Sequence, residues 1–281
     1  PTFGPYTGGT VIEVRGAGFL PGDRVLVGYR ECMDSQVIDS TTIVAVTPPA
    51  SMLDHQHKLS VLVSVRHASG LSHLIRVFTY GRPPRIDYVL PAIVPAEGAG
   101  ATLHGRALGN SQRLFADDIL ATLAPGTASS SRGAKLPASV EVSAKEGDVV
   151  GLLVDSVYGA TQLHPAYAYA SGKAALHGVS PSSGTVDGGQ DVAVIVELAG
   201  AKVESIAFDG VSAVYVIKDG AVIATTPKHK AGPTDVTVKT SAGTLTAKGA
   251  YTYVKPVAVK LVTPKLGPTK GGNQIQISGS G

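Results

Sequence analysis

The chain has 281 residues, of which 34 are glycine and 18 proline, with 43% hydrophobic, 5% aromatic and no tryptophan residues. Its formal charge is only +3, and it contains one cysteine, Cys32. The hydrophobic fraction excludes wholesale disorder, and the absence of a run of ~20 apolar residues excludes a membrane-spanning helix. The weak net charge argues against binding of nucleic acid, and a single cysteine rules out an intrachain disulfide.

A proline-to-glycine spacing recurs along the chain. Four prolines are each followed seven residues later by a glycine, and in three cases a second glycine comes next. The prolines are Pro1, Pro91, Pro181 and Pro264; the glycines are Gly8 and Gly9, Gly98, Gly188 and Gly189, and Gly271 and Gly272. Such periodicity indicates tandem copies of one module. We expect these glycines to take positive φ and turn the chain tightly onto a strand.

The first module, expected at residues 1–84, is a series of short alternating runs. Residues 10–16, 24–29, 41–46, 59–65 and 74–80 are rich in Val, Ile and Thr and bounded by turn residues, which predicts β-strands. The hydrophobic strand that precedes the proline in later modules is missing here. We therefore expect a segment cut from a longer polypeptide.

The second module, expected at residues 85–170, is the most divergent. Residues 111–124 have an amphipathic pattern that also fits a helix, but the repeat aligns residues 114–119 with residues 26–31 and 206–211, which favours strands. The small, polar stretch 124–135 predicts a mobile loop.

The third module is expected at 171–254, with predicted strands at 191–196, 203–208, 221–226, 235–240 and 244–253, and residues 255–281 are expected to open a fourth. Modules one to three close on aromatic residues, namely Phe78 and Tyr80, Tyr167 and Tyr169, and Tyr251 and Tyr253. Ten residues before each closing tyrosine lies a glycine, expected in a hairpin turn: Gly70, Gly159 and Gly243. Six or seven strands in about 85 residues indicate a β-sandwich.

The repeated motif resembles the IPT/TIG family of immunoglobulin-like domains. The first module carries it most fully, with Gly4-Pro5, Gly8-Gly9-Thr10 and Gly16-Ala17-Gly18-Phe19, and looser copies cover essentially the rest of the chain. The resemblance implies an all-β fold of tandem immunoglobulin-like β-sandwiches in an elongated row. It also implies occurrence in surface proteins, transcription factors and carbohydrate-active enzymes, and it brings no shared catalytic residues.

Residues that could carry chemistry are few. His55 and His57 would share one face if they lay on a strand, and His67 and His73 would form a pair if they faced each other across a hairpin, yet a third zinc ligand is not evident, and exposed loop and strand histidines are the default expectation. Cys32 lacks a neighbouring base, and Asp117, Asp118, Asp148 and Asp155 fit no calcium loop. Lys228-His229-Lys230 forms a small basic turn. No hydrolase, phosphate-loop, dinucleotide or metalloprotease motif occurs. We expect no enzyme activity, metal or cofactor.

The sequence predicts a structural and interaction role. Short proline-containing linkers such as Gly81 to Arg85 would make a semi-rigid rod that spaces or assembles components of a surface, filament or appendage. Partners would be other protein chains, including copies of itself. The alternative is recognition of glycans, as an adhesion module or an accessory domain of a carbohydrate-active enzyme, with Tyr6, Phe19 and Tyr29 as candidate platforms. We expect an extracellular or cell- or virion-surface location, the alternative being an intracellular fibrous assembly such as a cilium.

Overall fold

The computed structural model describes residues 1–281 except 54, 69, 219, 268–272 and 281, and gives the backbone alone for 71–76. The described residues form β-strands, and their only helical segment is the 3-10 turn η1 (Leu108–Asn110). By internal contacts the chain divides into two compact units. Unit 1 comprises Pro1–Asp87, Gly98–Pro137 and Leu152–Leu163, and unit 2 comprises Tyr88–Glu97, Ala138–Gly151 and His164–Gly281. Each unit is described by itself.

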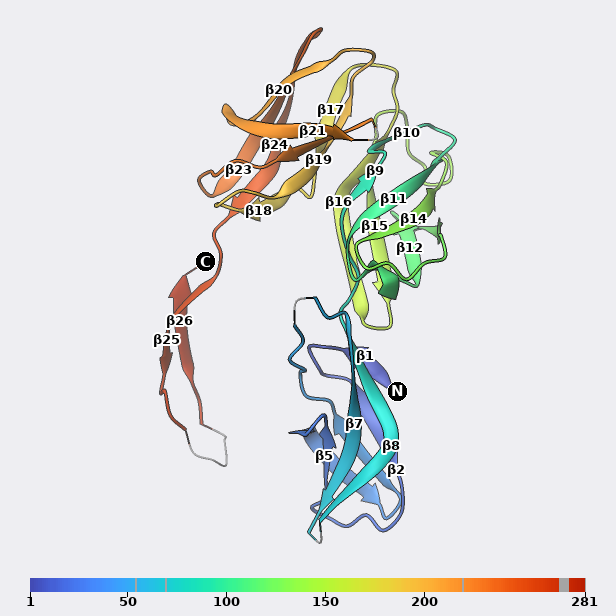
Figure 1. Ribbon diagram of the computed structural model, residues 1–281, viewed down its shortest axis with the longest axis vertical. Helices are drawn as coiled ribbons and strands as arrows, with labels where there is room; N and C mark the ends of the chain where they lie inside the picture. Colours follow the sequence, from blue (N-terminus) through green and yellow to red (C-terminus); the bar gives the residue numbers. More distant parts are fainter. Residues whose placement is uncertain (54, 69, 219, 268–272, 281) are drawn as a thin grey trace. The chain divides into compact units, whose positions relative to one another are not determined.

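Unit 1 begins with a two-sheet sandwich, here called the first sandwich (Figure 1). One sheet has the order β1-β8-β7-β3-β4, and the other has the order β2-β6-β5. The strands are β1 (Phe3–Pro5), β2 (Val11–Arg15), β3 (Arg24–Val27), β4 (Arg30–Glu31), β5 (Met33–Asp39), β6 (Thr42–Val46), β7 (Lys58–His67) and β8 (Gly70–Gly81).

Alternating side chains build the core of the first sandwich. In β2, Ile12 and Val14 are buried while Val11, Glu13 and Arg15 are exposed, as a half-buried strand requires. The core is completed from both sheets by Val25, Val27, Cys32, Ile43, Ala45, Val63, Val65, Phe78 and Tyr80. The five strand runs predicted in this segment are confirmed.

The rest of unit 1 contains β11 (Ala99–Arg106), β12 (Arg113–Ala116), β13 (Ile119–Leu123) and β14 (Ser131–Leu136). β14 pairs with β11 and β13, and β12 pairs with β13 and with β15 (Val149–Ser156), of which residues 152–156 belong to this unit. β9 (Arg85–Leu90) and β16 (Gly159–Tyr169) also run through both units.

Two expectations for this segment have opposite outcomes. The choice of strands over a helix for residues 111–124 is confirmed, because β12 and β13 form a hairpin there. The loop expected at 124–135 is wrong in its second half. β14 begins at Ser131, and the Arg132 guanidinium fixes it by donating to the carbonyls of Ala124 (3.1 Å), Leu108 (3.2 Å) and Ser111 (2.6 Å).

Unit 2 contains β10 (Ile93–Val94) and a sandwich, here called the third sandwich, with the strand order β17-β19-β22-β21-β20-β23-β24-β18. The strands are β17 (Ala175–Ser180), β18 (Ser183–Thr185), β19 (Asp191–Glu197), β20 (Val203–Phe208), β21 (Val211–Lys218), β22 (Ala221–Thr225), β23 (Gly232–Thr240) and β24 (Gly243–Val254). Its core is rich in valine and includes Phe208, Tyr251 and Tyr253. β25 (Ala258–Thr263) and β26 (Gln276–Ser280) follow as an antiparallel pair (Figure 1).

One pairing recurs that the sequence pattern did not predict. A short strand after each repeat proline pairs in parallel with the closing strand: β1 with β8, β10 with β16, and β18 with β24. The closing strands supply pairs of buried rings in edge-to-face contact, with centroids 4.9, 5.5 and 4.8 Å apart. The chain is therefore built of tandem immunoglobulin-like β-sandwiches, each fastened at its first and last strands.

Candidate functional site

The first glycine of each repeated pair lies against backbone of another segment. Gly8 has φ 77°, and a Cβ there would lie 2.7 Å from the carbonyl carbon of Pro48. Gly188 has φ 68°, and a Cβ there would lie 2.5 Å from the carbonyl carbon of Pro227. No side chain fits at either position without moving the backbone, so the glycine permits both the turn and the close approach.

The remaining sequence-predicted glycines divide into four groups. Gly9 and Gly189 also have positive φ, at 82° and 79°, with open space where a Cβ would stand. Gly98 has φ 81° and lies against the Leu136 carbonyl. The first residues of the closing strands, Gly70, Gly159 and Gly243, have φ of 142°, 121° and 139°. Gly271 and Gly272 lie outside the described residues.

Within unit 1, the segment that leaves β8 is held by Asn110 of η1. The Asn110 side chain is 8% exposed, and its amide donates to the carbonyl oxygens of Arg82 (2.9 Å) and His57 (3.3 Å). The Arg82 amide donates in turn to the His57 carbonyl at 3.0 Å. These bonds link the end of the first sandwich directly to the 3-10 turn after β11.

Tyr158, in the turn between β15 and β16, covers the same segment. A Cβ on Gly81 would lie 2.4 Å from the Tyr158 ring, so only glycine lets the ring lie on the backbone. The Phe3 ring meets Tyr158 edge-on at 6.4 Å, and the Lys58 ammonium lies 5.9 Å from its centroid. Burial raises the Tyr158 pKa. The Thr161 hydroxyl adds a 2.6 Å hydrogen bond to the Pro84 carbonyl. We call this set of contacts around the segment that leaves β8 the Asn110 junction. The sequence analysis looked for charged or nucleophilic residues and missed it, because the junction is built from Gly81, Tyr158 and Asn110.

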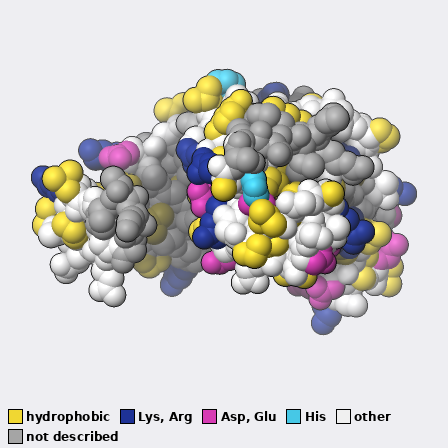
Figure 2. Space-filling model, turned by 90° about the horizontal axis from the view of Figure 1, so that it is seen from below, with side chains coloured by type: hydrophobic (Ala, Val, Ile, Leu, Met, Phe, Trp, Pro, Cys, Tyr) yellow, Lys and Arg dark blue, Asp and Glu magenta, His cyan; other side chains and the backbone are white. Residues whose placement is uncertain are grey.

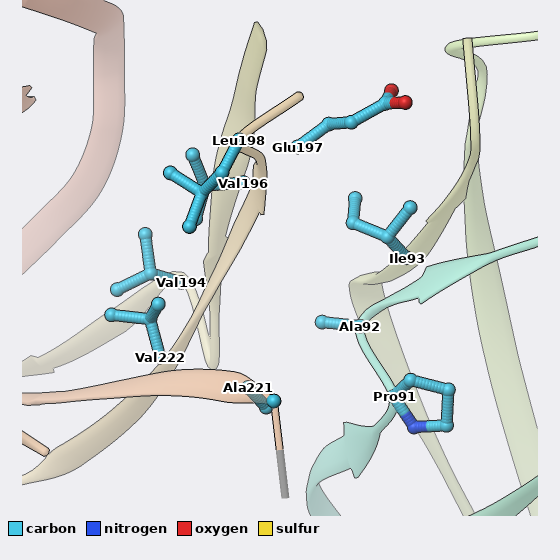
Figure 3. Close-up of a pocket in the computed structure, with 10 residues that line it drawn as sticks. Pro91, Ala92, Ile93, Val194, Val196, Glu197, Leu198, Ala221 and Val222 are labelled. Atoms are coloured by element: carbon cyan, nitrogen blue, oxygen red, sulfur yellow. The ribbon is translucent and has the colours of Figure 1, made fainter. Parts of the chain in front are cut away.

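Within unit 2, apolar contacts join the start of β10 to the third sandwich. Leu90 packs with Ala193, Ala221 and Ile223, and Ala92 packs with Ile195. Beside them is a hollow of about 340 Å³ (Figure 3), lined mostly by small aliphatic side chains. Among its described lining residues, Glu197 is the only one with an ionisable side chain.

In unit 2, Glu197 at the end of β19 is hydrogen-bonded to the segment that precedes β17. Its carboxylate accepts hydrogen bonds from the Ser171 amide (2.8 Å) and hydroxyl (2.9 Å) and from the Gly172 amide (2.7 Å). Burial alone would raise the pKa of Glu197, but these bonds outweigh it and the pKa is lowered. Burial lowers the pKa of nearby His177, against the opposing effect of the Glu197 charge.

The histidines do not form the expected pairs. His55 and His57 lie in the turn before β7 rather than on one face of a strand. His67 is opposite Gly70, and its Nδ1 lies 2.6 Å from Asp23 Oδ1. The His73 backbone is opposite Ser64, so the two histidines are not cross-strand neighbours; the His73 side chain lies outside the described residues.

The other reactive candidates have structural surroundings. Cys32 is 6% exposed, and burial together with the Glu31 charge raises its pKa to about 12. Asp155 pairs with Arg113 across two strands, Asp148 accepts from the Lys145 amide at 2.8 Å, and Asp117 lies in the β12–β13 turn with positive φ. Across the part of the chain that the structure describes, no three His, Cys, Asp or Glu residues are grouped to hold a metal ion.

The basic turn and the candidate aromatic platforms do not gather into one patch among the described residues. In the Lys228–His229–Lys230 turn, His229 stacks on Tyr253 at 5.0 Å. Figure 2 shows basic and acidic side chains interspersed on one face. Of the candidate glycan platforms, Tyr29 is 79% exposed, whereas Tyr6 lies under the Arg82 guanidinium and Phe19 packs against the first core.

Apolar side chains are exposed on two segments of unit 2. On β21, Val214, Val216 and Ile217 are 74%, 57% and 60% exposed. On β25 and β26, Val259 and Ile277 are 62% and 59% exposed, whereas the valines of β19 in the third sandwich are buried. Among the described residues, no helix is both long and apolar enough to cross a membrane.

Comparison with known proteins gives a family for the first sandwich. The family model described as the IPT/TIG domain matches residues 1–80. This is the part of the chain in which the repeated motif is most complete. No curated protein matches the chain in sequence.

Several solved structures are similar over most of the chain. The plexin A4 extracellular region is 12% identical, with 90% of this chain and 33% of that chain covered and a TM-score of 0.27. Titin domains I67–I69 are 10% identical, with 90% and 94% covered and a TM-score of 0.32. A Bacteroides ovatus glucan-utilisation protein, SGBP-B, solved with a mixed-linkage heptasaccharide, is 12% identical, with 92% and 66% covered and a TM-score of 0.25. The chain spans about a third of the plexin chain, and none of these likenesses indicates what it binds.

Proposed function

Since residues 1–80 are an IPT/TIG domain, we propose that the chain is a non-enzymatic structural and interaction segment, a semi-rigid rod of immunoglobulin-like modules. It spaces or assembles components of a surface, filament or appendage through protein–protein contacts. The modules are residues 1–84, 85–170 and 171–254, and residues 255–281 open a fourth. The repeated glycines serve the turns that let each sandwich close.

The Asn110 junction is the observation that carries this proposal. A linker that acts as a free hinge leaves its backbone to solvent, whereas here one buried amide holds two carbonyls and a tyrosine ring covers Gly81. In unit 2, the Glu197 hydrogen bonds and the Leu90 contacts serve the same purpose. Contacts of this kind oppose bending at the points where tandem modules usually move.

The proposed partners are other protein chains, including copies of this chain. The exposed valine and isoleucine side chains of β21 and of the β25–β26 pair support this, because several exposed apolar side chains gathered on one strand are typical of interaction sites. We place the rod outside the cell or on a cell or virion surface, with an intracellular fibrous assembly as the alternative.

Small-angle scattering of the purified chain tests the rod. A compact globule of 281 residues would have a radius of gyration of about 19 Å. Sandwiches with 12-residue strands are about 40 Å long, so three in a row would span about 120 Å and give a radius of gyration of about 35 Å. A value near 30 Å or above, unchanged with concentration, is expected. A value near 19 Å would refute the rod.

A further inference from the structure

A second hollow, of about 240 Å³, lies within unit 1 beside the segment that leaves β8. Its wall is formed by the end of the first sandwich and by the residues around β11 and β16. Tyr6, His57, Arg82, Arg85, Arg106 and Thr161 are the lining residues that matter here. The set includes three arginines, and no Asp or Glu is among the described residues of its wall.

The three arginine side chains differ in the hydrogen bonds and ion pairs that they already make. Arg82 is fixed, because its guanidinium donates to the carbonyls of Gln56 (3.0 Å) and Met52 (3.1 Å) and lies 4.7 Å from the Tyr6 ring centroid. Arg85 pairs with Asp87 at 2.8 Å. The Arg106 side chain is exposed and makes no hydrogen bond or ion pair with any residue that the structure describes.

The backbone brings Arg85 and Arg106 together on this wall. A Cβ on Gly105 would lie 1.9 Å from the Arg85 carbonyl oxygen, so the residue before Arg106 lies directly against Arg85. A second polar group on the wall, the imidazole of His57, also has a nitrogen atom without a hydrogen-bond partner among the described residues. The His57 Nδ1 atom is buried without a hydrogen-bond partner among the described residues, and buried polar atoms in native proteins nearly always have one.

We propose that this hollow is a binding site for a tetrahedral oxyanion, sulfate or phosphate, either free or carried on a small saccharide. Arg106 provides the planar fork of donors that matches two oxyanion oxygens, and Arg82 adds positive charge, whereas the charge of Arg85 is shared with Asp87. The wall repels cations, and its charge makes it unsuited to an apolar ligand. The site is independent of the rod, because it needs only the local wall of unit 1.

Titration calorimetry of the full chain tests the site with three probes: inorganic sulfate, inorganic phosphate and a sulfated monosaccharide. Chloride at matched ionic strength is the baseline. Saturable binding of at least one probe is expected, and Arg106→Gln is expected to weaken it about tenfold, the usual effect of losing a charge-assisted hydrogen-bond pair. Arg66→Gln is the matched control, since it removes an exposed arginine of the first sandwich outside the hollow and should leave binding unchanged.

The outcomes separate the sources of the anion. Tighter binding of the sulfated sugar than of inorganic sulfate supports a saccharide ligand, and equal or tighter binding of the inorganic ion supports a free anion. Two results would overturn the site: no saturable binding beyond the chloride baseline, or equal weakening by Arg106→Gln and Arg66→Gln. Thermal unfolding of both variants checks that they are folded, which is expected because both side chains are exposed.

Discussion

The Tyr80 hydroxyl donates a 2.6 Å hydrogen bond to the Pro48 carbonyl oxygen, and in the third sandwich Tyr253 repeats this bond to Pro227 at 2.7 Å. In both sandwiches the accepting carbonyl belongs to the residue against which the turn glycine lies, Gly8 in one case and Gly188 in the other. The closing strand, the glycine turn and the loop that follows β6 in one sandwich or β22 in the other are thus held together at one point.

Removing this hydroxyl should weaken each sandwich. Tyr80→Phe and Tyr253→Phe are each expected to lower the free energy of unfolding by about 1 kcal/mol, because a carbonyl loses its donor while the ring stays buried. Chemical denaturation followed by tyrosine fluorescence measures the change. Tyr29→Phe, at a side chain that is 79% exposed, should have no effect. Equal effects of all three substitutions would contradict the role of the hydroxyl.

The glycine pairs allow a comparison between neighbours. Both Gly8 and Gly9 have positive φ, so alanine at either should cost about 1 kcal/mol from backbone strain. At Gly8 the new methyl group also meets the Pro48 backbone, and the cost should be at least about twice as large. The same order is expected for Gly188→Ala against Gly189→Ala. Thermal unfolding of the four variants decides it, and an equal loss within each pair would disprove the steric part.

Asn110 should control the exposure of the segment that leaves β8. Asn110→Ala leaves the Arg82 and His57 carbonyls without their side-chain donor, so the Arg82 amide, which is bonded to His57, should exchange about tenfold faster with deuterium. Hydrogen exchange with mass spectrometry of peptides covering residues 78–90 measures this. Gln112→Ala, at the nearby exposed position, is the control. Unchanged exchange in Asn110→Ala would remove the main support for a stiff junction.

Glu197 predicts a dependence of stability on acid. Its pKa is lowered in the folded chain from an ordinary value of 4.5, so its contribution is complete above about pH 4.5 and is lost as the pH falls through the lower, folded value. Glu197→Gln should cost about 1.5–3 kcal/mol at pH 7, the usual range for hydrogen bonds to a charged group. The difference from wild type should shrink below pH 4.5. A difference that stays constant from pH 7 to pH 3 would show that the charge is not involved.

Cys32 should report on opening of the first core. Because the thiol is 6% exposed and burial raises its pKa to about 12, iodoacetamide at pH 8 should label it at least about a hundredfold more slowly than it labels free glutathione. Denaturant should restore the normal rate. Fast labelling in the native protein would mean that β4 and its neighbours open readily.

The sequence was most informative where side chains alternate. The strand runs of the first and third sandwiches follow from residues such as Ile12 and Val14, whose burial is set by the period of two. The β12–β13 hairpin required the repeat as well, since its residues also fit a helix. The strand β14 was missed, because its start depends on Arg132, whose three carbonyl acceptors come from distant positions.

The candidate sites were harder to predict for the same reason. His67 and His73 are symmetric about Gly70 in sequence, but the strand register sets His67 opposite Gly70 and His73 opposite Ser64, so the two histidines are not cross-strand neighbours. The junction residues Asn110 and Tyr158 carry no local pattern, and their partners lie far away in the sequence, from 28 residues for Arg82 and Asn110 to 155 residues for Phe3 and Tyr158. No motif connects residues that meet only after folding.

The parallel pairing of β1 with β8, and of β18 with β24, has a mechanical consequence. In each pair the incoming chain enters the first strand and the outgoing chain leaves the last strand at opposite ends of three aligned residues. Tension between the two ends of such a sandwich pulls the strands past each other, so the hydrogen bonds are stretched together rather than broken one after another. A chain of these modules therefore resists tension applied between its two ends. The resistance comes from the short parallel pairings, in which the central residues of the first strands are glycines, Gly4 and Gly184.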